Sequence, residues 1–184
     1  MKPVKDMTIG ELGAFVSDHL ESHSVKVTLT GGACVSIYSD NRYQSWDLDF
    51  IEEIPPGRKR LSELLAEIGF KEERRYFRHP ETEFFLEFPP GPLSVGGEPM
   101  REIIDKKFST GTLRMISPTD CVKDRLAAFY HWDDRQSLEQ ALMVARAQDV
   151  DLLEIQRWSE REGEPGKFDK FMSMLPDESR VNGQ

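Results

Sequence analysis

The sequence predicts an α/β fold of the α+β kind: a mixed β-sheet flanked by helices, followed by a C-terminal helical subdomain. Two observations carry this prediction. Strand-like and helix-like segments alternate up to about residue 116, and only helical periodicity follows. We therefore expect an α/β core over 1–116, a helical subdomain over 117–178 and a polar tail over 179–184.

The first portion begins with a helix start signal. Thr8-Ile9-Gly10-Glu11 has the pattern of a capping box, so a helix is expected from there to about Glu21. The further elements expected in this portion are strands over 25–30 and 46–51 around a short helix over 33–39, a helix around Leu61–Ile68, strands over 74–78 and 83–88, a loop over Pro89–Pro99, and a hairpin of 102–108 with 112–116.

The second portion has its own start signals. Ser117-Pro118 places a capping residue before a proline at the first helical position, and Asp151 can cap a later helix. Apolar residues at helical spacing predict helices after Ser117, after Asp134 and after Asp151, and a short amphipathic segment around Phe168–Met172.

Composition and charge restrict the function. Of the 184 residues, 38% are hydrophobic and 31% charged, which is enough for a core without metal or disulfide cross-links. The net charge of −9 argues against a general nucleic-acid coat. Residues 56–80 are the exception, with seven basic and four acidic side chains. They form either a solvated surface or a patch that faces phosphate.

We expect a cytoplasmic protein. No apolar run approaches the ~20 residues of a membrane helix, and no apolar segment follows the N-terminal lysines as in a signal peptide. The two cysteines, Cys34 and Cys121, lie far apart in the sequence and fit a reducing setting.

The acids of residues 46–51 are the most informative feature. Because side chains alternate along a strand, Asp47 and Asp49 should share one face, while Trp46, Leu48 and Phe50 face the core. Glu87 is the one charge after Glu83 in the apolar run to Phe88. If the two strands are neighbours in register, Glu87 joins the aspartates.

Three adjacent carboxylates favour a divalent cation. Two carboxylates ~6 Å apart repel by roughly 2.8 kcal/mol at an effective dielectric constant of about 20. An all-oxygen donor set selects Mg²⁺ or Mn²⁺. Gly31-Gly32 ends one strand and opens a helix, so its backbone N–H groups can approach phosphates, although an ordinary turn has the same pattern.

Together these residues resemble the nucleotidyltransferase superfamily with the DNA polymerase beta-like fold. The family's pattern of strand, Gly-Gly or Gly-Ser turn, short helix, Asp-x-Asp strand and later acidic strand matches Gly31-Gly32, Asp47-Leu48-Asp49 and Glu87. The segment from Arg42 to Asp49 has the form Arg-x-x-Ser-x-Asp-x-Asp, which is similar to small prokaryotic members that include abortive-infection-type toxins.

The resemblance implies the site and the activity. Asp47, Asp49 and Glu87 would be the catalytic acids and the ligands of Mg²⁺ or Mn²⁺, and Glu87 would take the proton of the attacking hydroxyl. Gly31, Gly32 and Ser45 would hold the phosphates of a nucleoside triphosphate (NTP). The reaction would move a nucleoside monophosphate (NMP) to a hydroxyl and release pyrophosphate. The acceptor is open between an RNA end, a protein hydroxyl and a small molecule.

Other residues are less specific. Arg42 could contact the triphosphate or lie in a solvated turn, and Lys123 could contact phosphate or lie on the surface. His19 and His23 have a metal-binding spacing on a helix, but no third ligand is near in the sequence, so we interpret them as exposed histidines.

Two rival functions belong to other classes. The chain could be a non-catalytic module of the same fold that binds a nucleotide or a partner protein, as in a toxin–antitoxin pair. It could also be a metal-dependent phosphohydrolase, which would release phosphate rather than pyrophosphate.

Overall fold

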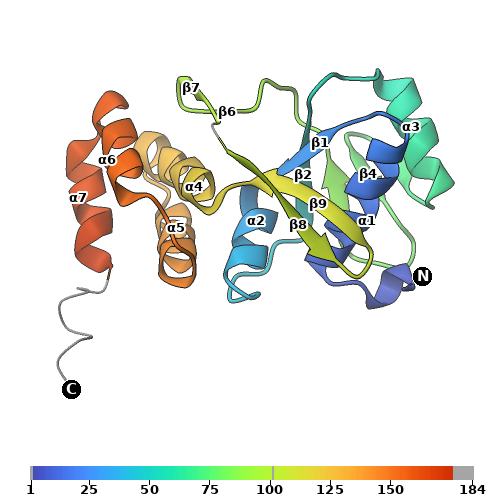
Figure 1. The fold of residues 1–184 in the computed structure, drawn as a ribbon, viewed down its shortest axis with the longest axis horizontal. Helices are drawn as coiled ribbons and strands as arrows, with labels where there is room; N and C mark the ends of the chain where they lie inside the picture. Colours follow the sequence, from blue (N-terminus) through green and yellow to red (C-terminus); the bar gives the residue numbers. More distant parts are fainter. Residues whose placement is uncertain (1, 101, 176–184) are drawn as a thin grey trace.

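A computed structural model describes residues 2–100 and 102–175 of the chain. A seven-stranded mixed sheet forms its centre, and helices flank the sheet (Figure 1). The predicted α/β class with a mixed sheet is confirmed. The polar tail predicted for 179–184 lies outside the described residues.

The elements follow the predicted order. The helices are a short 3₁₀ helix η1 (Val4–Asp6), α1 (Ile9–Ser22), α2 (Gly31–Tyr38), α3 (Arg58–Glu67), α4 (Pro118–Trp132), α5 (Arg135–Ala147), α6 (Leu152–Arg161) and α7 (Pro165–Met174). The strands are β1 (Val27–Thr30), β2 (Asp47–Glu52), β3 (Lys71–Glu73), β4 (Tyr76–Arg78), β5 (Phe85–Glu87), β6 (Ser94–Val95), β7 (Glu98–Pro99), β8 (Ile103–Phe108) and β9 (Gly111–Ile116).

The capping interactions predicted for α1 and α4 are formed in the structure. In α1, the Glu11 backbone N–H donates to Thr8 Oγ1, and the Thr8 backbone N–H donates to the Glu11 carboxylate, which completes the capping box. In α4, Ser117 Oγ accepts from the Asp120 N–H, and Pro118 occupies the first turn. These local bonds fix where the two helices begin.

The sheet order β3-β4-β5-β2-β1-β9-β8 places β2 at its centre. Strand β2 pairs antiparallel with β1 and parallel with β5, and β1 pairs parallel with β9. A central strand is held on both edges, so the side chains that it presents are fixed in position. The residues of interest on β2 therefore sit on a rigid element.

One face of the sheet packs against α1. A Cβ added to Gly13 of α1 would lie 3.3 Å from the side chains of both Leu48 and Leu113, so the helix backbone approaches β2 and β9 closely. Leu48 and Phe50 are both fully buried on this face. Helices α4 to α7 gather at one end of the sheet, on the left of Figure 1, away from α1 and α3.

Three features differ from the expectation. The sequence did not reveal β3, whose residues 71–73 are exposed and carry no apolar pattern. The loop over 89–99 contains the small hairpin of β6 and β7. Trp46 was expected in the core but is 50% exposed, because β2 begins only at Asp47 and the indole packs at the sheet margin near Phe84.

Within residues 2–100 and 102–175, no helix combines the length and apolar character that a bilayer span requires.

Candidate active site

The central strand β2 presents two acids on the face opposite α1. Asp47 and Asp49 are partly exposed, and they alternate with the buried Leu48 and Phe50. This alternation follows from the pleat of a strand whose other face is the core. The two carboxylates therefore lie on one face of the sheet, as predicted.

The parallel pairing of β2 with β5 brings in the third acid. Asp47 lies opposite Phe85 in this register, and Asp49 lies opposite Glu87. Neighbouring strands are about 4.8 Å apart, so Asp49 and Glu87 occupy adjacent positions on one face. The convergence of Asp47, Asp49 and Glu87, which their distance in sequence left open, is thus present in the structure.

Asp49 has the most perturbed carboxyl of the three. Burial, followed by the negative charges of Asp47 and Glu87, raises the pKa of Asp49 to about 7. Arg125 of α4 acts in the opposite direction. Without a cation, the protein therefore holds the Asp49 carboxyl partly protonated at neutral pH.

The diglycine lies directly against these acids. Gly31 begins α2 with φ +68°, and a Cβ at this position would lie 2.7 Å from Asp49 Oδ2. A Cβ on Gly32 would lie 2.9 Å from Ser45 Oγ. At position 31, glycine is required both for the left-handed backbone and for the close approach of the Asp49 carboxylate. The start of α2 is thus in contact with the acidic face of β2.

Ser45 links the diglycine to the acids. Its hydroxyl donates to Asp47 Oδ1 over 2.6 Å, and its backbone N–H donates to Ser36 Oγ of α2 over 2.8 Å. Thr30 Oγ1 donates to the Asp49 carbonyl oxygen. These bonds fix the loop before β2 against the first turns of α2 and orient the Asp47 carboxylate.

Arg42 lies exposed in the turn between α2 and β2. Its position agrees with either alternative that the sequence left open, a contact to a bound triphosphate or a solvated turn.

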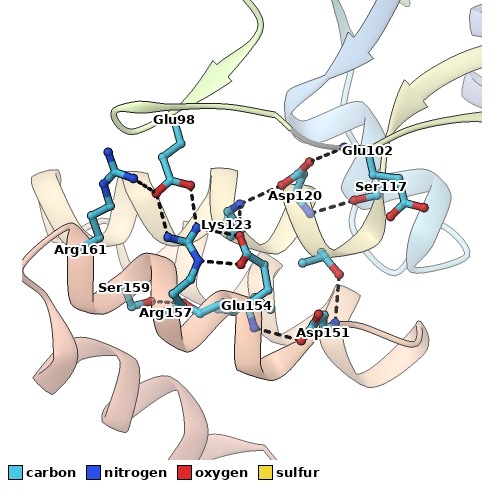
Figure 2. A network of polar contacts seen from close by, with 12 residues as sticks. Glu98, Glu102, Ser117, Asp120, Lys123, Asp151, Glu154, Arg157, Ser159 and Arg161 are labelled. Atoms are coloured by element: carbon cyan, nitrogen blue, oxygen red, sulfur yellow. Dashed lines mark hydrogen bonds and ion pairs between the residues drawn. The ribbon is translucent and has the colours of Figure 1, made fainter.

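Lys123 is not where the sequence analysis placed it. Both expected roles required exposure, but its side chain is 0% exposed, with Nζ 3.1 Å from Asp120 and 3.2 Å from Glu154 (Figure 2). A buried ammonium held by two carboxylates cannot reach a phosphate without breaking this network. Lys123 therefore stabilises the packing of α4 against α6, and the prediction that it lies on the surface is wrong.

The network around Lys123 joins the helices to the β6–β7 hairpin. Figure 2 shows Glu98 of the hairpin reaching α6, where Arg157 and Arg161 donate to its carboxylate. Hydrogen bonds from Arg157, and then from Lys123, lower the pKa of Glu154 to about 2. Figure 2 thus shows a polar network that links α4, α6 and the hairpin.

Two arginines near the acids were not among the site residues predicted from the sequence, although Arg75 belongs to the basic segment 56–80. Arg75 Nε, in the turn between β3 and β4, lies 3.3 Å from Glu87 Oε1. Arg125 follows the buried Lys123 by two positions on α4, hydrogen-bonds to Asp124 and acts on the charge of Asp49. The helical spacing around Lys123 could have indicated Arg125, but nothing in the sequence shows that this face of α4 turns toward the sheet.

Solved structures of other proteins are similar to this one. The structure is similar to that of an antigenic nucleotidyltransferase-like protein from Paracoccidioides brasiliensis, with a TM-score of 0.61 and 11% identity over 96% of this chain and 97% of that one. ANT(2'')-Ia in complex with adenylyl-2''-tobramycin gives a TM-score of 0.46 and 12% identity over 90% of this chain and 97% of that one. No protein-family profile and no curated protein sequence matches the chain.

The first of these likenesses shows that the chain has a nucleotidyltransferase-like fold, as the sequence resemblance implied. At such low identity the likeness extends to the fold alone, so the activity has to be argued from the residues of this chain.

The raised pKa of Asp49 makes stability depend on pH. Between about pH 4 and 7 the folded protein keeps a proton that the unfolded chain has released, so stability falls as pH rises through this range. We expect Asp49→Asn to gain stability over wild type, from near zero at pH 4 to on the order of 4 kcal/mol above pH 7. Urea unfolding in chelator measures this difference, and a pH-independent difference would contradict it.

Gly31→Ala should abolish the proposed activity without unfolding the protein. The added methyl group meets Asp49 Oδ2 and forces a non-glycine residue to φ +68°. Gly166→Ala in α7 is the matched control, since a Cβ there meets nothing within 4 Å. Turnover and circular dichroism are compared for both variants. Full activity in Gly31→Ala would show that the diglycine does not border the working site.

Lys123→Met should destabilise the protein by about 3–5 kcal/mol, because it removes the cation that the buried Asp120 shares with the partly buried Glu154. Denaturant unfolding at neutral pH provides the measurement. A variant of wild-type stability that has lost NTP binding would restore Lys123 to the nucleotide site.

Proposed function

We propose that this protein is a divalent-metal-dependent nucleotidyltransferase that moves an NMP from an NTP to a hydroxyl acceptor and releases pyrophosphate. The observation that carries the proposal is the cluster of Asp47, Asp49 and Glu87 against the diglycine at the start of α2. The nucleotidyltransferase-like fold supports it.

The donor set suits Mg²⁺ or Mn²⁺. Asp49 ionises only near pH 7 because burial and two neighbouring acids oppose its charge. A divalent cation removes this opposition, and three carboxylates offer the oxygen ligands that such ions prefer. Asp47 and Asp49 would hold the metal, and Glu87 would complete the set. When bound, the metal would supply charge stabilisation for in-line phosphoryl transfer.

The remaining residues would bind and orient the substrates. The backbone N–H groups of Gly31 and Gly32 would bind the β- and γ-phosphates next to the acids. Ser45, whose hydroxyl orients Asp47, would contact the phosphates from the same side. Glu87 would accept the proton of the attacking hydroxyl, since a positioned carboxylate can act as a general base. Arg75 holds Glu87 from the solvent side, which orients this carboxylate.

Positive charge near the triphosphate would come from Arg125 and Arg42 rather than Lys123. Arg125 already acts on Asp49 across the gap between α4 and β2. A guanidinium can pair with phosphate through two parallel hydrogen bonds, which suits this position.

The branch of the superfamily and the acceptor class are separate proposals, and the sequence motif bears on the first of them. The Arg42-to-Asp49 motif supports the prokaryotic toxin-like branch and, with it, a partner protein of the toxin–antitoxin kind. An RNA end, a protein hydroxyl and a small molecule stay equal candidates for the acceptor.

The direct test is transfer of a label from α-phosphate-labelled NTPs to pooled RNA, protein and small-molecule acceptors in Mg²⁺. Asp47→Asn should lower transfer about 10³-fold or more, because the loss of metal-borne charge stabilisation costs ~4 kcal/mol or more. Asp105→Asn, an exposed acid on β8 of the same sheet, is the matched control and should keep wild-type activity.

Other outcomes separate the rival functions. Equal labelling by wild type and Asp47→Asn would remove the catalytic claim. A thermal shift with ATP and Mg²⁺ but no turnover would indicate a binding module, and release of phosphate instead of pyrophosphate would indicate a phosphohydrolase.

A further inference from the structure

The ends of α1 and α3 meet on the side of the sheet opposite the acid cluster. His19 and His23 lie in the last turn and at the C-cap of α1, and Glu67 is the last residue of α3. Glu67 Oε2 lies 3.7 Å from His19 Nε2 and 3.6 Å from His23 Nε2. One ligand atom from each residue falls within 4.8 Å of the others. The fold thus supplies the third ligand that the sequence lacks near the two histidines.

The hydrogen bonds of His23 leave one ring nitrogen available to a metal. Its Nδ1 lies 2.9 Å from the carbonyl oxygen of His19 and 3.0 Å from Ser22 Oγ. The Ser22 hydroxyl donates its own proton to the same carbonyl oxygen, so both neighbours accept and Nδ1 carries the proton. The Nε2 atom, which faces Glu67, then has its lone pair free. A ligating histidine in proteins is held in the same way, by a hydrogen bond from its other nitrogen to a carbonyl or carboxylate.

His19 is held at the same place by a bond that a metal can replace. Its Nε2 lies 2.8 Å from the carbonyl oxygen of Leu64, near the end of α3, and therefore donates its proton there. Metal binding at Nε2 would require the other tautomer of His19, with this proton transferred through solvent to Nδ1, and would exchange the N–H···O bond for a nitrogen–metal bond. The exchanged hydrogen bond is worth only ~1 kcal/mol net, far less than a metal–ligand bond.

The surrounding charge favours a cation. Helix C-termini carry about half a negative charge each, and the C-termini of α1 and α3 converge here with the Glu67 carboxylate. Cation binding is therefore supported by the backbone as well as by the three side chains.

We propose that His19, His23 and Glu67 form a second metal site, selective for Zn²⁺ or a similar borderline ion, which fastens α1 to α3. Tetrahedral zinc with bonds near 2.05 Å places its ligands about 3.4 Å apart, so the two Glu67–His pairs need move only a few tenths of an ångström. The exposed fractions of the side chains are 15%, 33% and 50%, which leaves room for water as the fourth ligand.

The site differs in chemistry from the acid cluster. Two imidazoles and one carboxylate suit Zn²⁺, whereas three carboxylates suit Mg²⁺. Because Asp47 and Asp49 point away from the α1 face, the two sites can be tested independently of each other, and neither depends on the other's function.

The test is zinc titration of the tag-free, full-length chain by calorimetry in excess Mg²⁺, with Co²⁺ absorption as a second probe. We expect one Zn²⁺ per chain, tetrahedral Co²⁺ bands and a higher melting temperature with zinc. His23→Gln and Glu67→Gln, both at accessible positions, should each weaken zinc binding at least about 100-fold and remove the thermal shift.

Two controls define the result. His131→Gln, an exposed histidine paired with Glu162 at the far end of the molecule, should bind zinc as wild type does. Asp47→Asn should also bind zinc normally, whatever its effect on nucleotide transfer. Wild-type zinc affinity in His23→Gln, or no binding by wild type at micromolar zinc, would overturn the proposal.

Discussion

The mutual repulsion of three carboxylates is the constraint around which the candidate active site is built. The register of β2 with β5 places Glu87 beside Asp49, and burial of Asp49 strengthens the repulsion until its pKa reaches about 7. A fold that served stability alone would gain by replacing one of these acids. The arrangement becomes favourable when a divalent cation lies between them.

The surroundings of the acids agree with this requirement. Gly31 allows the backbone of α2 to approach Asp49, and Ser45 orients Asp47 from the same side. Arg75, in the turn between β3 and β4, forms an ion pair with Glu87, and Arg125 of α4 lowers the pKa of Asp49. The helices that follow the sheet thus contribute to the site, through Arg125, rather than only to packing.

The sequence predicted those parts of the site that local rules determine. Alternation along 46–51 assigned Asp47 and Asp49 to one face, and capping patterns located α1 and α4. The position of Glu87 beside Asp49 depends on the pairing of β2 with β5. The residue pattern along a single strand does not show which strand is its neighbour. Lys123 was misplaced for the same reason, because its burial comes from α6 and from Glu154, a residue 31 positions away.

The sequence likewise did not predict Glu67 as the third ligand beside His19 and His23, because the packing of α3 against α1 brings this residue close to them. Trp46 differs from the prediction for a local reason. It precedes β2, which begins at Asp47, so the alternation of the strand does not include it and its ring is half exposed. Long-range pairing, rather than local propensity, is the information that the sequence alone does not supply.

The most direct measurement is the anomalous scattering of Mn²⁺ in crystals grown with a non-hydrolysable NTP. We expect a manganese peak bounded by the carboxylates of Asp47, Asp49 and Glu87, with the triphosphate against Gly31 and Gly32. A crystal with the nucleotide bound elsewhere, or with no manganese at these three carboxylates, would contradict it.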